Sequence, residues 1–455
     1  NMLYVTYIAV AAVAVVLLVD PNDFKGRIAE ATEQATGRRL SIDGKIELKL
    51  FPQFALAVGG ASLSNPAGFG GAPFATVRRI ALRVELLPLL HKELKVGRIE
   101  IDGMDLRLAR NAAGKGNWED FGQQPAGPAR NPSEGGLKSL ELEGLRITQG
   151  HVQYGSVNAE AIDLDLGRIA PGVAVPVKLS LGLRTAPEAA GLQLAGSFSL
   201  APDVKAKRYQ LSKVSLAGTL ALKAAPKPLN WQLASPALDI NLGEQSLSKT
   251  ELDAQLGLVK LSGSVSGERL LDAPALRGEL DVKPLDLRGL FTQLGITPPV
   301  TRDAAVLSSL AFTGRYAYGN GQLEIDHLDA RLDATRLQGR FGLHAASGTK
   351  TFDLSLDGID VDRYLPPPTT ADKQEKAPFE LPVASLKGLH ARGQLSAGQV
   401  TVSGVKLSAV KLGIDAHDGI TQLAPLRAQL YDGQCAGTVR IDTRSSLPTV
   451  SIAQS

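Results

Sequence analysis

The feature that most constrains the fold is a period-two alternation of apolar and polar residues along most of the chain. The stretch VPVKLSLGL, for example, places Val175, Val177, Leu179, Leu181 and Leu183 on one parity. A β-strand puts alternate residues on the same side, so this pattern is typical of strands with one apolar face. Turn-forming stretches such as YGNGQ, GEQS and AASGTK separate later runs. The sequence therefore predicts a mostly β protein whose strands are joined mainly by hairpins.

A glycine recurs on the apolar parity of these runs. It stands at Gly196 in LQLAGSFSL, Gly218 in VSLAGTLAL and Gly263 in VKLSGSV, with looser copies around Gly278, Gly314, Gly339, Gly393 and Gly437. A glycine there leaves a gap and lets the strand bend, and the irregular spacing excludes a fixed-period solenoid. We expect an elongated, curved antiparallel sheet of unequal hairpins. Two or three stacked β-sandwiches with glycines at bulges are the alternative.

The N-terminus carries an uncharged run from Met2 to Val19, which has the length of a bilayer-spanning helix and ends at Asp20-Pro21. A secretory signal peptide is the alternative, but its apolar core is shorter and ends in a small-residue cleavage site, which Leu-Leu-Val-Asp-Pro lacks. We predict a transmembrane helix, with all that follows on one side of a membrane.

Further segments give the organisation of the chain. A short helix is expected after the anchor, capped by Asn22 or Asp23 and ended by Gly37, and another over residues 84–94. Two stretches rich in proline and glycine separate the strand runs. The predicted division is a transmembrane anchor at 1–20, an N-terminal module with short helices at 21–121, a flexible loop at 122–136, an elongated β-sheet groove at 137–365, a linker at 366–378, and a C-terminal β segment at 379–455 that we expect to be truncated.

Composition excludes some classes of function. The formal net charge is +3, which gives no electrostatic reason to expect a nucleic-acid partner. Cys435 is the single cysteine, so neither an internal disulfide nor a cysteine-based zinc site can form.

A search for catalytic or metal-binding patterns finds none. The six histidines lack the spacing of a helical zinc site, and neither a phosphate-binding loop nor a nucleophile elbow occurs. Asp163 and Asp165 could form a carboxylate pair, but a solvent-facing strand stripe explains them better, and His151 beside Tyr154 is read in the same way. We expect no enzyme, no metal and no cofactor.

An apolar strand face can close into a dry core or stay open as a groove, and periodicity does not separate the two. An open aliphatic groove suits a lipid, because each acyl CH₂ kept out of water is worth about 0.8 kcal/mol and a sixteen-carbon chain on the order of 12 kcal/mol. The candidate lining residues are the same-parity side chains beside the recurring glycines: Leu194, Phe198, Leu216, Leu220, Leu261, Val265, Phe312, Tyr316, Leu337, Phe341, Leu395 and Val439.

Several stretches resemble the AsmA family of bacterial envelope proteins. They are DPNDFKGRIAEATEQATGRRLSIDGKIELKLFP from Asp20, NPAGFGGAPFATVRRIALRVELLPLLHKELKVGRIEIDGMDLRLARN from Asn65, GKGNWEDF from Gly114, and LRAQLYDGQCAG from Leu426. The resemblance implies an elongated, taco-like β-groove that carries phospholipids, tethered in the inner membrane of a Gram-negative cell and projecting into the periplasm. It also implies that GNWEDF is a family marker, in which Trp118 and Phe121 pin the loop to the first strands and Asp120 or Glu119 satisfies turn amides.

The leading hypothesis is therefore a single-pass inner-membrane protein that moves phospholipids between the inner and outer membranes and supports outer-membrane lipid homeostasis. Inner- or outer-membrane partner proteins are compatible with it. The alternative is a periplasmic scaffold that assists assembly of outer-membrane β-barrels through unpaired sheet edges. A third hypothesis, an envelope hydrolase, would need a cleft with convergent histidines and acids. A polar substitution such as Leu220→Asp should block transfer in a folded protein if the face is open, and should unfold the protein if the face is a closed core.

Overall fold

The computed structural model describes residues 20–49, 54–84, 95–119, 141–170, 172–185, 191–223, 225–367, 386–431, 433–445 and 447–454. The anchor expected at 1–20 lies outside these ranges except for Asp20, as do the expected loop at 122–136 and most of the expected linker at 366–378. The helix expected over 84–94 also falls outside them, apart from Val84, which ends a strand. Within the described ranges no helix is both long and apolar enough to cross a bilayer.

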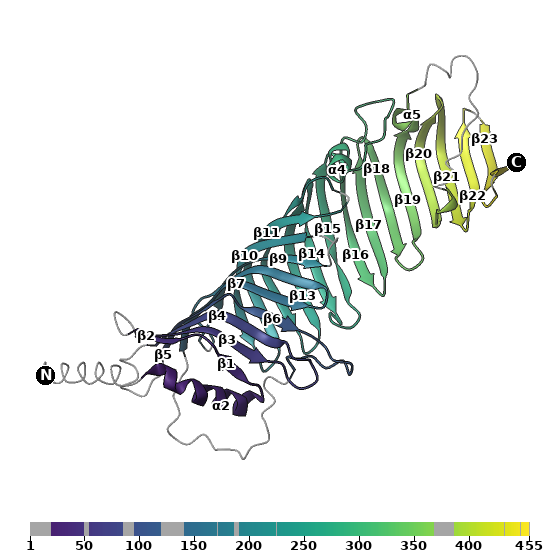
Figure 1. The fold of residues 1–455 in the computed structure, drawn as a ribbon. Coiled ribbons are helices and arrows are strands. Elements are labelled where there is room, and N and C mark those ends of the chain that lie inside the picture. Colours follow the sequence, from purple (N-terminus) through teal and green to yellow (C-terminus); the bar gives the residue numbers. More distant parts are fainter. Residues whose placement is uncertain are drawn as a thin grey trace. The chain divides into compact units, whose positions relative to one another are not determined.

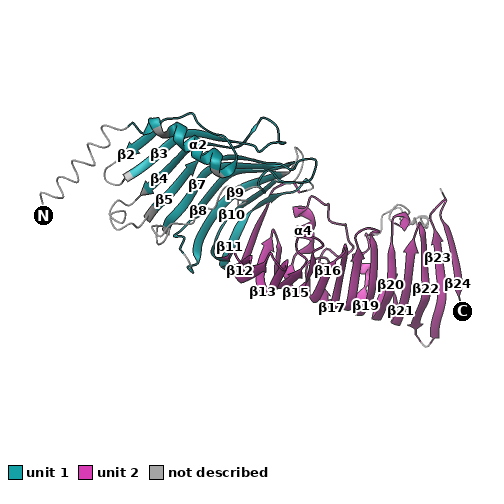
Figure 2. Ribbon diagram, turned by 90° about the horizontal axis from the view of Figure 1, so that it is seen from below, with its two compact units in different colours: residues 1–202, 211–223 teal, residues 203–210, 224–455 magenta. Residues whose placement is uncertain are grey.

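The chain divides into two compact units, coloured separately in Figure 2. Unit 1 comprises Asn1–Pro202 and Leu211–Lys223, and unit 2 comprises Asp203–Gln210 and Ala224–Ser455. The boundary falls at the β10–β11 hairpin, whose tip is grouped with unit 2. Each unit is described on its own below.

Unit 1 begins with the helical segment that the sequence predicts. A 3₁₀ turn, η1 (Pro21–Phe24), leads into α2 (Lys25–Thr36). The expected cap at Asn22 or Asp23 is wrong, because the Asp20 carboxylate accepts the Asn22 N–H and so caps η1 one turn earlier. Gly37 ends α2 as predicted, since its φ of 70° suits glycine and its N–H donates to the Glu33 carbonyl.

The rest of unit 1 is a β-sheet in which neighbours in sequence are mostly antiparallel neighbours in space (Figure 1). Both β5 and β6 pair in parallel with β7, so the chain crosses back between them. The strands are β1 (Leu40–Ile42), β2 (Ile46–Lys49), β3 (Phe54–Ser64), β4 (Pro73–Val84), β5 (Lys95–Asp102), β6 (Asp105–Leu108), β7 (Glu141–Tyr154), β8 (Val157–Leu166), β9 (Val175–Thr185), β10 (Gly191–Asp203) and β11 (Arg208–Ala221).

Unit 2 continues as a run of long antiparallel hairpins, with one parallel pairing between β19 and β20. The predicted turns YGNGQ, GEQS and AASGTK connect β16 to β17, β12 to β13 and β18 to β19. The strands are β12 (Leu229–Asn241), β13 (Ser246–Leu256), β14 (Val259–Glu268), β15 (Ala275–Leu285), β16 (Leu310–Gly319), β17 (Gln322–Leu332), β18 (Thr335–His344), β19 (Thr349–Asp360), β20 (Ala391–Val402), β21 (Val405–His417), β22 (Ile420–Leu430), β23 (Gly433–Asp442) and β24 (Thr449–Gln454).

The strand ladders decide between a single sheet and stacked sandwiches. In the described part of each unit the strands pair edge to edge into one sheet, and no second sheet covers either face. The stacked-sandwich alternative is therefore wrong for both units. Unit 2 also contains two short helices that the sequence did not predict, α4 (Leu287–Gln293) and α5 (Val361–Tyr364).

The recurring glycines have a more specific role than leaving a gap. A Cβ atom built on Gly263 would lie 2.1 Å from the backbone oxygen of Glu279 on β15, and one on Gly339 would lie 2.0 Å from the backbone oxygen of Asp353 on β19. Gly339 also has a φ of 143°, in a region that other residues rarely adopt. At these two glycines the backbone of the next strand therefore comes closer than a residue with a side chain would allow.

Helix α5 is held to the β15–β16 connection by half-buried polar groups. The Asp333 carboxylate accepts the backbone N–H groups of Leu307, Ser308 and Ser309, and the Tyr364 hydroxyl donates to it over 2.8 Å. The Arg363 guanidinium of α5 pairs with Asp303 at 2.8 Å. These contacts tie the β15–β16 connection to α5 and to the β17–β18 turn.

We expect Gly263→Ala to lower the free energy of unfolding by about 1–3 kcal/mol, because the new methyl group can be accommodated only if the β14 or β15 backbone shifts. The matched control is Gly71→Ala, where nothing lies within 4 Å of the added Cβ. Urea unfolding of the full chain in detergent measures both. Equal midpoints for the two variants would contradict the close approach of these strands.

Acid should weaken the Asp333 contacts. Burial alone would raise the Asp333 pKa, but the three backbone donors and Tyr364 outweigh it and hold the pKa below its ordinary value of 3.8. Burial, together with the hydrogen bond to Asp333, raises the pKa of Tyr364 to about 12. A carboxylate whose pKa is lower in the folded than in the unfolded protein stabilises the fold fully at a pH above its unfolded-state pKa. That stability is lost as the pH falls through the folded-state pKa.

The urea midpoint of the wild type should therefore decline below about pH 4. The Asp333→Asn variant should be less stable at neutral pH and should show a flatter profile in this acid range. Parallel profiles for the wild type and the variant would contradict a role for this carboxylate.

Candidate functional site

The register of unit 2 gathers aliphatic and aromatic side chains on one face of the sheet, here called the apolar face. Directly paired residues lie on the same side, so rows can be followed from strand to strand. One row comprises Ala254, Leu261, Val282, Phe312, Ala330, Leu337, Leu356, Ala397 and Val410, and another comprises Gly278, Tyr316, Ile325, Phe341, Phe352, Gly393, Ile414, Leu423, Val439 and Ile452. The face is continuous from β13 to β24.

The eight lining residues predicted in unit 2 all lie on this face. Leu261, Phe312 and Leu337 belong to the first row and Tyr316, Phe341 and Val439 to the second. Val265 is four residues from Leu261 on β14, so it shares its parity. Leu395 pairs with Leu354 and Leu412 in a row between the two.

Unit 1 has an apolar face of its own. Its rows run through Leu56, Leu82, Ile99, Leu145, Leu166, Val177 and Phe198, and through Val58, Ile80, Ile101, Ile147, Leu164, Leu179 and Gly196. Of the four residues predicted here, Phe198 is in the first row and Leu194 pairs with Leu181 on the same side. Leu216 of β11 reaches the same face, since its side chain lies 2.6 Å from a Cβ built on Gly196, and Leu220 shares the parity of Leu216.

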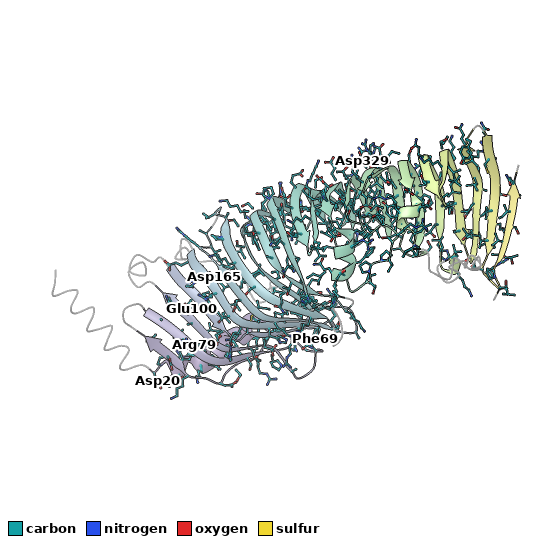
Figure 3. All side chains as sticks on the ribbon, turned by 90° about the horizontal axis from the view of Figure 1, so that it is seen from above. Asp20, Phe69, Arg79, Glu100, Asp165 and Asp329 are labelled. Atoms are coloured by element: carbon teal, nitrogen blue, oxygen red, sulfur yellow. The ribbon has the colours of Figure 1, made fainter. Side chains whose placement is uncertain are left out.

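Burial shows how these faces differ from a closed core. All twelve predicted lining side chains are half-buried: none is enclosed and none is fully exposed. Fully buried hydrophobic residues such as Val282, Leu285 and Val306 are few in the described chain. Figure 3 shows the side chains that project from the strands, and in the described part of each unit the strands form a single sheet. An aliphatic face covered only by its own neighbours keeps part of its surface available to a ligand. That these residues line a lipid groove remains a prediction.

The opposite face of each sheet carries the charges. In unit 1, Arg98 pairs with Asp165, which is labelled in Figure 3. In unit 2, Arg336 pairs with Asp329 at 2.5 Å, and a hydrogen bond from this guanidinium lowers the pKa of Asp329. Such exposed pairs add little stability and keep this face solvated.

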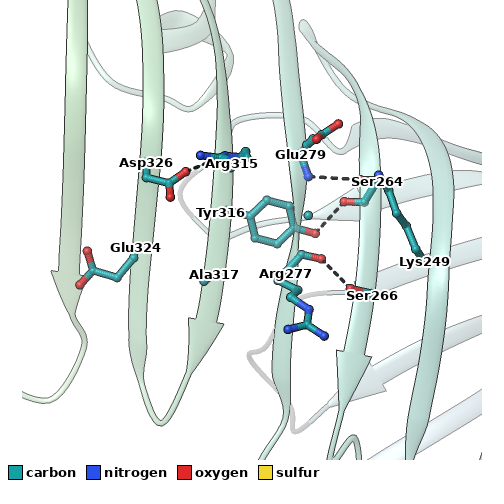
Figure 4. A pocket seen from close by; sticks show the side chains of 11 residues that line it. Lys249, Ser264, Ser266, Arg277, Glu279, Arg315, Tyr316, Ala317, Glu324 and Asp326 are labelled. Carbon is teal, nitrogen blue, oxygen red and sulfur yellow. Dashed lines mark hydrogen bonds and ion pairs between the residues drawn. The ribbon is translucent and has the colours of Figure 1, made fainter.

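Two open hollows of unit 2 are lined largely by charged and polar residues. One of about 380 Å³ is lined by Lys249, Ser264, Arg277, Glu279 and Arg315 among others, as Figure 4 shows. The Tyr316 ring reaches across Gly278, and its hydroxyl donates to the Ser264 carbonyl over 3.2 Å. A second hollow, of about 660 Å³, adjoins the first through Glu279 and Arg315. Beside these hollows β14 presents the small side chains of Ser262, Ser264 and Ser266.

The residues considered for chemistry have ordinary partners. Asp163 accepts the Gln149 N–H and Asp165 pairs with Arg98, so the two carboxylates serve different contacts. His151 lies 3.1 Å from Asp105 on a half-exposed strand surface. Among the described residues no group of three or more histidine, cysteine, aspartate or glutamate side chains could hold a metal ion.

The described part of the GNWEDF stretch makes contacts that the prediction did not name. The Trp118 ring packs edge-on against Tyr154 of β7, with ring centroids 5.7 Å apart. Glu119 pairs with Arg110 at 3.1 Å. Asp120 and Phe121 lie outside the described residues.

Asn117 is the residue that sequence reasoning missed, because alternation carries no signal for a buried polar group in a loop. Its side chain is fully buried and accepts the Ala109 N–H. It also donates to the Arg107 carbonyl and to the Asn65 side chain, both over 2.8 Å. The buried Arg38 guanidinium donates to the Asn117 carbonyl. The loop is thus a structural junction of unit 1.

These observations define a class: single-layer β-sheet units with one half-buried apolar face and one charged face. The sequence profile of the AsmA family matches residues 4–455, and the chain belongs to this family. Protein AsmA of Escherichia coli (strain K12) is 26% identical over 231 residues, which cover 48% of this chain and 34% of that relative. The matched part therefore spans about a third of the relative's length. No solved structure matches the chain.

Replacing Asn117 by alanine should lower the free energy of unfolding by about 1–3 kcal/mol, because its buried side chain makes part-buried hydrogen bonds to the backbone of Arg107 and Ala109 that would be lost. The control is Lys115→Ala on the exposed part of the same loop. Thermal unfolding and limited proteolysis of the full chain report the difference. An Asn117→Ala protein as stable as the control would refute the junction.

Proposed function

We propose that this chain carries phospholipids along the apolar faces of its sheets, between the inner and outer membranes of a Gram-negative cell. Membership of the AsmA family supports a role in the envelope, in lipid transport or in outer-membrane assembly. The observation that carries the lipid proposal is the half-buried aliphatic face with no covering layer in the described chain. In this proposal the N-terminal run anchors the chain in the inner membrane and the sheets lie in the periplasm.

The physical argument is the cost of exposing hydrocarbon. A lipid leaving a bilayer through water would expose chains worth on the order of 12 kcal/mol each. A face of leucine, valine and phenylalanine side chains replaces the contacts that the chain loses, while the headgroup stays in water. The proposal involves no catalysis, because the face offers hydrocarbon and the ionisable groups are paired on the opposite side.

We expect Leu337→Asp to abolish phospholipid retention in a folded protein, because a carboxylate on a half-buried face disrupts hydrocarbon contact without being trapped in a core. The matched control is Gln338→Asp, which places the same charge one residue away on the exposed face. Lipids extracted from the purified, detergent-solubilised full chain are quantified by mass spectrometry, with circular dichroism as the fold check.

Loss of lipid in both variants, or in neither, would contradict the proposal. Unfolding of Leu337→Asp alone would indicate a closed core at this position. In that case Leu220→Asp provides an independent test on the apolar face of unit 1.

A scaffold that assists outer-membrane β-barrel assembly is the second candidate. The observation that favours it is β24, which is exposed along its length, including Val450 and Ile452, and which among the described residues pairs with β23 alone. Such an edge can template another strand. A Val450→Pro change would impair barrel assembly under this hypothesis and leave lipid retention intact.

A further inference from the structure

One join between the described strands of unit 2 differs from the others. Strands β19 and β20 pair in parallel, from Lys350 beside Ala391 to Asp360 beside Thr401. A tight turn cannot link parallel strands, and parallel pairing is slightly less stable per residue than antiparallel pairing. Antiparallel strands lie on both sides of the join, β12 to β19 on one side and β20 to β24 on the other. The β19–β20 ladder therefore holds together two blocks, here called the β12–β19 block and the β20–β24 block.

The parallel direction of these strands decides what lies at their ends. Because β19 and β20 run the same way, both end at the same edge of the sheet. There the chain passes from β19 into α5, and β20 turns back into β21. Helix α5 contacts β20 and lies at this edge in Figure 1. The topology thus places α5, which belongs to the end of one block, beside the first turn of the other.

The Asp362 carboxylate of α5 binds the β20–β21 turn. Its two oxygens accept the backbone N–H groups of Ser403 and Gly404, each over 2.7 Å. These are the two central residues of the turn, with φ values of 51° and 74°, and Val402 pairs with Val405 across it. In a two-residue turn the ladder pairs the flanking residues and leaves the central N–H groups for another acceptor. Asp362 supplies that acceptor for both groups.

Helix α5 is itself fixed to the β12–β19 block. The Arg363 guanidinium pairs with Asp303 of the β15–β16 connection at 2.8 Å, and the Arg363 carbonyl accepts the Asp303 N–H over 3.1 Å. The Tyr364 hydroxyl donates to Asp333 at the β17–β18 turn over 2.8 Å. Asp362 is therefore positioned by one block while its carboxylate binds the other.

The charge of Asp362 strengthens this contact. The hydrogen bond from the Gly404 N–H lowers the pKa of Asp362 below its ordinary value of 3.8, against the opposing effect of desolvation. The group is therefore ionised at neutral pH, and hydrogen bonds to a charged acceptor are stronger than those between neutral groups. A second side-chain bond across the join, from the Ser396 hydroxyl to the Leu354 carbonyl, is longer, at 3.4 Å.

We infer that α5 is a clasp that keeps the sheet of unit 2 closed between β19 and β20, and that Asp362 is its closing residue. When the clasp is released, the β20–β24 block separates from β19 more often. Each separation interrupts the apolar face and exposes the backbone edges of both strands. The inference concerns the continuity of the sheet and does not depend on what the apolar face carries.

Hydrogen exchange of the detergent-solubilised full chain, followed by mass spectrometry, tests the clasp. In Asp362→Asn an amide NH₂ group replaces one acceptor oxygen, so one N–H of the turn loses its partner. Peptides from β19 and β20 should then exchange about tenfold faster, while those from β16 to β18 keep their wild-type rates. The matched control is Asp418→Asn, the same change at the exposed β21–β22 turn on the opposite edge of the sheet, which should leave exchange at β19 and β20 unaltered.

Wild-type exchange at the join in Asp362→Asn would overturn the clasp, and so would faster exchange spread evenly over all strands of unit 2. Arg363→Gln is an independent test, because it releases α5 from Asp303 and leaves the Asp362 carboxylate intact. It should accelerate exchange in the β15–β16 connection and at β19 and β20 together. Release of the connection without a change at the join would contradict the role of α5. If circular dichroism shows that Asp362→Asn alone is unfolded, Arg363→Gln decides.

Discussion

The register of strand pairing is the constraint on which both units depend. In a single-layer sheet the strand ladder pairs the hydrogen-bonding groups of the backbone. Which side chains lie on which face, however, depends on each strand pairing without a slip in register. A slip of one residue would exchange the faces, because side chains alternate with a period of two. Pairing Leu337 with Leu356 places hydrocarbon beside hydrocarbon, whereas a shifted pairing would place Leu337 beside Ser355 or Asp357. The apolar face exists only because the register is kept across many strands.

Bulges and glycines keep that register in unit 2. Shifts occur between Thr313 and Arg315 and between Ile325 and Leu328, beside glycines whose missing side chains admit a neighbouring backbone or side chain. Only one alignment matches each glycine to the strand segment that approaches it. The same positions that let the sheet bend therefore also fix which residues face which.

Much of this architecture follows from alternation and turn chemistry. The predicted residues from Leu261 to Val439 share one face because parity is a local property that hairpins transmit from strand to strand. Cross-strand contacts do not follow from it. The oxygen that excludes a side chain at Gly263 belongs to Glu279, on another strand. Helix α4 is seven residues long, too short for a clear helical period, and Asn117 is a polar residue buried by distant partners. These features depend on tertiary neighbours, which periodicity does not encode.

The hairpin connectivity of the sheets has a consequence for how the chain folds. From β13 to β19 each strand pairs with the strand made just before it. Every step except β15 to β16, whose connection contains α4, therefore closes only a short loop at a small entropic cost. The parallel step from β19 to β20 needs a longer closure before its ladder can form. Unit 2 can therefore grow strand by strand as the chain is delivered from its N-terminus, with its slowest addition at β20.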